Sequence, residues 1–127
     1  MPSWSDEDGV VASQLAVLMP ALLVLLMLAV QFGLWAHASQ LARAAADEAA
    51  YIAALPEASE QAGRAAAAEL LAQAGNLTAV NISVDRQSDT VVATVTGVAP
   101  QVLPGFRWSV SATAAAPVER FIPQGSR

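Results

Sequence analysis

Residues 10–36, VVASQLAVLMPALLVLLMLAVQFGLWA, decide the fold of this chain of 127 residues. No Asp, Glu, Lys or Arg occurs from Gly9 to Ala42, and every position from Leu15 to Val30 is apolar. A helix of about 20 mostly apolar residues crosses a hydrocarbon core about 30 Å thick and satisfies its own backbone hydrogen bonds there. The stretch therefore predicts a transmembrane helix over residues 10–36, with the lipid bilayer as its partner.

A buried core helix is the alternative interpretation of the same stretch. The rest of the chain is only about 90 residues long and rich in Ala, which is too little to surround a helix that is apolar on all sides. We therefore favour the membrane.

The composition argues against several classes of function. The six basic residues are all Arg and are scattered singly along the chain, so there is no basic stripe for nucleic acid. The absence of Cys excludes a disulfide framework, a thiolate zinc site and a Cys nucleophile. One His, scattered acids and no phosphate-binding or hydrolase motif predict no catalytic residues, metal, cofactor or small-molecule substrate.

The head of the chain, residues 1–9 (MPSWSDEDG), is short, polar and acidic. Gly9 closes it, and the apolar stretch starts at once with Val10. This layout resembles a prepilin leader cut after Gly, in which Gln14 would become the fifth residue, a position where Glu is usual. An uncharged amide costs less in the bilayer than a carboxylate, but it cannot neutralise the amino terminus of a neighbouring subunit. Gly9, Val10 and Gln14 are therefore the candidate site for a prepilin peptidase, with an uncleaved head as the alternative.

A secretory signal peptide is a further alternative, because Ala36-His37-Ala38 has the small-x-small form of a cleavage site. However, the head has no Lys or Arg, and the apolar stretch is long for a signal peptide. Near the ends of the stretch the only basic residue is Arg43, so the positive-inside rule leaves the orientation open.

The helical pattern continues beyond the membrane, and we expect one helix over residues 10–55. Pro20 removes one backbone donor and predicts a kink near Ala16, which neighbouring helices in lipid would tolerate by contacting the freed carbonyl. Beyond it, residues at heptad spacing form a predominantly small-residue seam for helix packing. With Pro20, the packing set is Trp35, Ala38, Ala42, Ala45, Ala49 and Ile52. The seam fits an oligomer and this chain's own sheet equally well.

Residues 56–127 predict a small exterior domain. Pro56 ends the first helix and fits the start of a second over residues 56–75, with Gly75 as its C-cap. Apolar and polar residues then alternate, which predicts strands near 77–85, 90–98 and 106–114 followed by an irregular tail. The predicted fold class is α+β: a long transmembrane helix that continues into a pilin-like domain with a second helix and a three-stranded antiparallel sheet.

Three passages together resemble a known family: DEDGVVASQLAVLMPALLVLL, QFGLWAHASQLARAAADEAA and VTGVAPQVLPGFRWSVSATAAAPVERF. They are similar to the TadE/TadG-like proteins of tight-adherence (Flp-type IV) pilus assembly. The resemblance implies a single-pass protein of the cytoplasmic membrane, with an extracytoplasmic C-terminal domain. It also implies a minor-pilin-like or pseudopilin role among other pilin-like or Tad-system membrane subunits, and leaves entry into the filament open. Gln14 and the acidic head depart from the family pattern.

A second class of function is a membrane-tethered extracytoplasmic binding module of unknown ligand. In that case the helix would only hold the domain at the membrane, and its packing surface would be dispensable.

Overall fold

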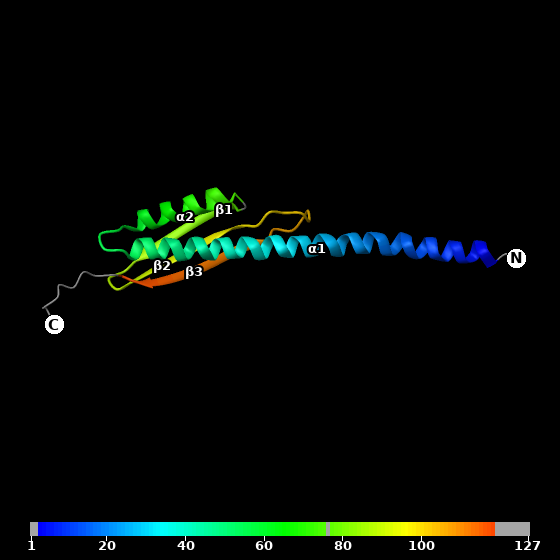
Figure 1. The fold of residues 1–127 in the computed structure, drawn as a ribbon, viewed down its shortest axis with the longest axis horizontal. Coiled ribbons are helices and arrows are strands. Elements are labelled where there is room, and N and C mark those ends of the chain that lie inside the picture. Colours follow the sequence, from blue (N-terminus) through cyan, green and yellow to red (C-terminus); the bar gives the residue numbers. More distant parts are fainter. Residues whose placement is uncertain (1–2, 76, 119–127) are drawn as a thin grey trace.

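The computed structural model describes residues 3–75 and 77–118 and consists of one long helix with a small α+β cap at its C-terminal half (Figure 1). The cap is the second helix and the three-stranded sheet with their loops. This arrangement confirms the predicted α+β fold class. The elements are α1 (Ser3–Ala54), α2 (Glu60–Ala74), β1 (Thr78–Arg86), β2 (Thr90–Val98) and β3 (Ser109–Pro117).

α1 is one continuous helix and extends beyond its predicted start. It begins at Ser3 rather than Val10, because acidic residues favour the positive end of a helix and Gly9 alone does not stop one. It also continues through Pro20, and in the view of Figure 1 it has no sharp bend, so the predicted kink near Ala16 is not observed there. The unbroken hydrogen bonds on either side of Pro20 keep this segment helical.

α2 begins at Glu60 rather than at the predicted Pro56. Ser59 is its N-cap, with extended backbone angles and a side-chain oxygen that accepts a hydrogen bond from the Ala62 N–H at 3.2 Å. At the other end Gly75 adopts φ 69°, as predicted for a C-cap, and its N–H donates to the Leu71 carbonyl.

The sheet is antiparallel with the order β1-β2-β3, so β2 is the central strand. Its buried residues alternate with less buried ones, and Val91, Ala93 and Val95 point to the core, as the alternation in the sequence predicted. β3 begins at Ser109 rather than at residue 106. The Ala99 N–H donates to the Trp108 carbonyl, and this bond closes a loop over residues 99–108. Residues 119–127 of the predicted tail lie outside the described residues, whereas Ala116 and Pro117 belong to β3.

The core lies between the C-terminal half of α1, α2 and the sheet, and it consists mainly of Ala. The seam alanines at 38, 42, 45 and 49 are fully buried against the chain's own cap, while Trp35 and Ile52 are partly buried. The buried face is wider than the predicted seam, because α1 contacts both α2 and the sheet. It also includes Ala46, Ala50, Ala53 and Ala54.

The two helices approach each other closely at Gly63 of α2. A Cβ at this position would lie 2.6 Å from the Ala49 carbonyl oxygen and 2.9 Å from the Ala53 Cβ. Backbone cannot yield as a flexible side chain would, so any side chain at residue 63 separates α1 from α2.

We expect Gly63→Ala to lower the free energy of unfolding of the cap by about 1–3 kcal/mol, through this overpacking. The measurement is denaturant unfolding of the full chain in mild detergent, followed by tryptophan fluorescence. Gly33→Ala is the matched control: nothing lies within 4 Å of a Cβ there, and Ala is the better helix former. Equal stability of the Gly63→Ala variant and the unsubstituted protein would contradict the close packing.

Candidate functional site

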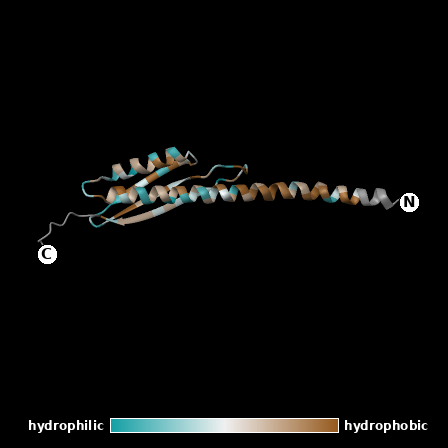
Figure 2. Cartoon of the chain, viewed as in Figure 1, coloured by the Kyte–Doolittle hydropathy of each residue, from teal (hydrophilic) through white to brown (hydrophobic). Residues whose placement is uncertain are grey.

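Residues 9–30 of α1, which we call the rod, expose mainly apolar side chains on all sides of the helix. Among residues 9–30 only Met27 is even partly buried, and Figure 2 shows the hydrophobic colour along this half of the helix. The stretch Gly9–Ala54 is long and apolar enough to cross a membrane by length and composition, with a mean hydropathy of 2.6 in its most apolar part. An apolar surface of this extent is not stable in water, so lipid or other apolar helices must cover it.

The predicted processing residues lie on this rod. Gly9 and Val10 are inside the continuous helix rather than at its start, and Gln14 is exposed less than two turns further along. Pro20 is also exposed, whereas the other predicted packing residues belong to the half of α1 that contacts the cap. The structure therefore separates Pro20 from the rest of the predicted packing set.

Gln31 marks the place where the rod ends and the cap begins. Its side chain is 0% exposed, and it is the first buried residue along the part of α1 whose burial is described. Its Nε2 donates to the Pro100 carbonyl at 2.9 Å, and its Oε1 accepts from the N–H groups of Val102 at 2.7 Å and Leu103 at 3.2 Å. The part of α1 that the cap leaves uncovered therefore ends at Val30, although Phe32 just beyond it is 61% exposed.

This role of Gln31 could not be predicted from its neighbours in the sequence, because a lone Gln at the end of the apolar stretch indicates only a polar interruption. The available signal was a single amide at the end of that stretch, which must find partners if it is buried. No pattern in the sequence indicates that these partners are backbone groups in the loop at 99–108.

Aromatic side chains gather around the same junction. The rings of Phe32 and Trp35 are 5.8 Å apart, and the Trp35 Nε1–H donates to the Ser109 carbonyl at 3.1 Å. Phe106, in the loop, is 65% exposed. Trp35 and the exposed His37 both stand just beyond Gln31 along α1.

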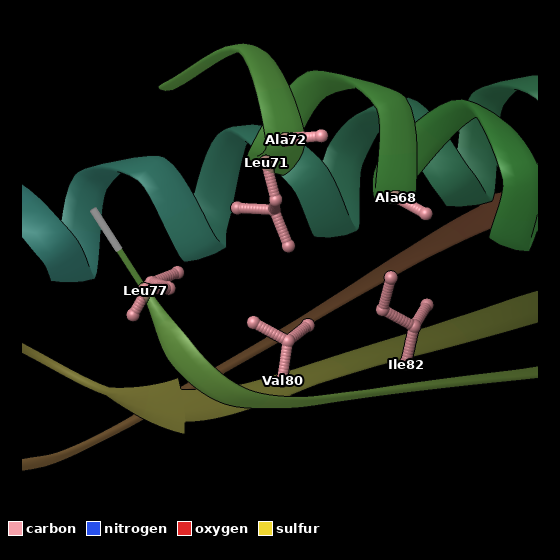
Figure 3. A pocket seen from close by; sticks show the side chains of 6 residues that line it. All are labelled: Ala68, Leu71, Ala72, Leu77, Val80 and Ile82. Atoms are coloured by element: carbon pink, nitrogen blue, oxygen red, sulfur yellow. The ribbon is translucent and has the colours of Figure 1, made fainter. Parts of the chain in front are cut away.

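The cap has an apolar groove between the C-terminal end of α2 and the start of β1 (Figure 3). It is open to solvent and has a volume of about 370 Å³. Leu71 points from α2 towards Val80 and Leu77. The complete lining is Ala68, Leu71, Ala72, Leu77, Val80 and Ile82, without any ionisable side chain.

The described charged side chains that make hydrogen bonds have structural roles in the cap. Glu60 accepts a hydrogen bond from the Arg86 backbone N–H at 3.2 Å, and the Arg86 guanidinium donates to the Ala58 carbonyl. These contacts connect the start of α2 to the end of β1. Within residues 3–75 and 77–118 no three His, Cys, Asp or Glu side chains come together in a group that could hold a metal ion.

We expect Gln31→Leu to release the loop at 99–108, because it leaves the Val102 and Leu103 N–H groups and the Pro100 carbonyl without their partner. Unsatisfied buried groups cost about 1–3 kcal/mol, so amide exchange at Val102 and Leu103 should accelerate about tenfold or more. Hydrogen exchange of the full chain in detergent measures this change. Gln40→Leu makes the same substitution at an exposed position of α1 and should leave the exchange unaltered. Unchanged protection of the loop in Gln31→Leu would refute the role of the Gln31 amide.

Residues 9–50 match the family described as TadE-like protein, a segment that covers the rod, the junction and most of the Ala-rich half of α1. No curated protein and no solved structure matches the chain. The resemblance noted in the sequence is thus confirmed over residues 9–50 of the long helix, which are similar to TadE-like proteins.

Proposed function

We propose that the protein is a pseudopilin-like or minor-pilin-like component of a Tad (Flp-type) pilus assembly or secretion system. Its TadE-like segment indicates involvement in Tad pilus assembly. In this proposal the rod anchors the chain in the cytoplasmic membrane and packs against other pilin-like or Tad-system subunits. The cap stands on the extracytoplasmic side and docks to partner subunits.

The observation that supports this proposal best is the division of α1 into two halves. The buried alanines of its C-terminal half, at positions 38, 42, 45, 46, 49, 50, 53 and 54, are already covered by the cap, so they offer no surface to another subunit. The rod has no cover from its own chain, although it carries large apolar side chains on every side. Contacts with other helices in the membrane must therefore use the rod, where Gln14 and Pro20 interrupt an otherwise uniform apolar surface.

The second candidate, a membrane-tethered binding module, is favoured by the groove between α2 and β1. Its lining is apolar and open, as a docking site for an apolar segment would be. In this case the rod only holds the cap at the membrane. Both candidates are non-enzymatic, and neither involves a nucleic acid, a metal ion or a small-molecule substrate.

Substitutions in the rod distinguish the two candidates. If the rod assembles with other subunits, Gln14→Leu and Pro20→Leu should strongly reduce piliation in the native host, because both remove a feature that neighbouring helices can recognise. Val17→Leu is the control, since Val17 is 72% exposed and the change keeps the surface apolar. Pili counted by electron microscopy give the readout, with equal amounts of each variant in the membrane fraction. Normal piliation in all three variants would favour the tether.

The intact mass of the chain isolated from membranes tests processing. Cleavage by a prepilin peptidase predicts a product that begins at Val10, and Gly9→Leu should abolish the shortening, because it puts a bulky side chain at the bond to be cut. A full-length product from the unsubstituted chain would show an unprocessed anchor. Loss of residues 1–38 would show a secretory signal peptide and would overturn the membrane anchor itself.

A further inference from the structure

We propose that the loop between β2 and β3, residues 99–108, inserts into the interfacial layer of the lipid bilayer and gives the protein a second membrane contact beside α1. This inference rests on the proposed function in one respect, namely that the rod spans the membrane.

The position of the loop supports this. It extends from the sheet along α1 towards the N-terminal half of the helix (Figure 1). The hydrogen bonds of Gln31 fix its depth along α1. From Gly9 to Val30 the rod measures roughly 30 Å at about 1.5 Å per residue, which equals the thickness of the hydrocarbon core. If the rod fills that core, the membrane surface lies at Gln31, and the loop lies at the same level.

The side chains of the loop suit this layer. Phe106 is 65% exposed and Val102 is 40% exposed, and Pro104 is exposed between them. In water these side chains have no cover from their own chain, whereas at the membrane surface they continue the apolar surface of the rod. Phe32, 61% exposed on α1, and its neighbour Trp35 add rings of the kind that collect where hydrocarbon meets headgroups.

Part of the loop backbone is also satisfied within the chain, which lowers the cost of a less polar medium. Unsatisfied N–H and C=O groups are the main cost of placing an irregular segment near lipid. Here the Gln31 side chain satisfies two N–H groups and one carbonyl, and the Ala99 N–H donates to Trp108. Pro100 and Pro104 have no N–H to satisfy.

The distribution of charged residues also favours contact between the loop and the membrane surface. The protein has a net charge of -5, yet no Asp or Glu occurs in residues 9–46 or 90–118. The loop and the part of α1 beside it thus carry no carboxylate that anionic headgroups would repel. The one ionisable residue of the loop is Arg107, which is exposed and can pair with a lipid phosphate.

A second membrane contact, through the loop, restricts the orientation of the cap more than the anchor in α1 does alone. A cap held only by α1 can rotate about the helix axis, whereas a loop embedded beside the helix fixes which side of the cap faces the membrane. The groove between α2 and β1 then keeps a constant height and direction above the bilayer. The loop thereby orients the surface that meets other subunits.

Site-directed spin labelling tests the proposal, and the chain has no native Cys to remove. Phe106→Cys and Val102→Cys are each labelled with a nitroxide in the full chain, reconstituted in vesicles of phosphatidylcholine and phosphatidylglycerol. Leu22→Cys in the rod is the lipid control, and Ala115→Cys, exposed on β3, is the water control. We expect the ratio of oxygen to nickel-chelate accessibility at both loop positions to be severalfold higher than at position 115 and lower than at position 22, which lies near the middle of the rod.

Each other outcome overturns the proposal in a distinct way. If both loop labels resemble the label at position 115 while position 22 is in lipid, the loop lies in water and the anchor alone remains. If the loop labels are shielded from both reagents, protein covers the loop, and a second copy of the chain is its partner in the vesicle. If position 22 itself is accessible to the nickel chelate, the rod does not span the membrane and the proposed function fails as well.

Discussion

The rest of the structure depends on one constraint: the single unbroken helix α1 has one half without cover from its own chain and one half packed against the cap. The half from Val10 to Val30 exposes large apolar side chains on all sides and receives no cover from its own chain. From Ala38 to Ala54 small residues dominate, and a cap of one helix and three strands covers them. Because the backbone hydrogen bonds of a helix are internal, the same element can serve both halves without a break. The side chains alone decide what each half contacts.

The Ala-rich interface stabilises the cap through close approach of the backbones rather than through large buried side chains. Each Ala buries little apolar area, but it loses no side-chain entropy and allows the backbones of α1, α2 and the sheet to approach closely. The stabilisation then comes from many short contacts, and these are lost as soon as the elements separate. Two special positions follow from this geometry. Gly63 stands where α2 touches the α1 backbone, and Gln31 binds the loop at 99–108 where the Ala face gives way to the rod.

Local patterns in the sequence predicted the elements, and contacts between distant residues are what they could not predict. The apolar stretch, the alternation in Val91, Ala93 and Val95, and the cap at Gly75 all depend on neighbouring residues, and each is found in the structure. Gln31 bonds to residues about 70 positions away, so no periodicity could reveal its partners. The groove between α2 and β1 likewise exists only once α2 lies over the edge of the sheet. The heptad spacing identified the buried alanines but underestimated the width of their face, because a seam assumes one partner and α1 has two.

This division of α1 determines which surfaces remain for assembly. A helix whose small residues faced lipid could pack against any similar neighbour, but here those residues are occupied within the chain. Large apolar side chains interdigitate well with lipid tails too, so the rod alone gives little preference for a protein neighbour over lipid. Selective contacts therefore have to come from the few interruptions of the rod, Gln14 and Pro20, or from the cap. In the cap, the groove under α2 and the unpaired edges of β1 and β3 remain, apart from the Ser109 carbonyl at the start of β3, which accepts a hydrogen bond from Trp35 of α1. An assembly built from this chain would thus use the membrane to bring subunits together in one plane and the cap to choose among them.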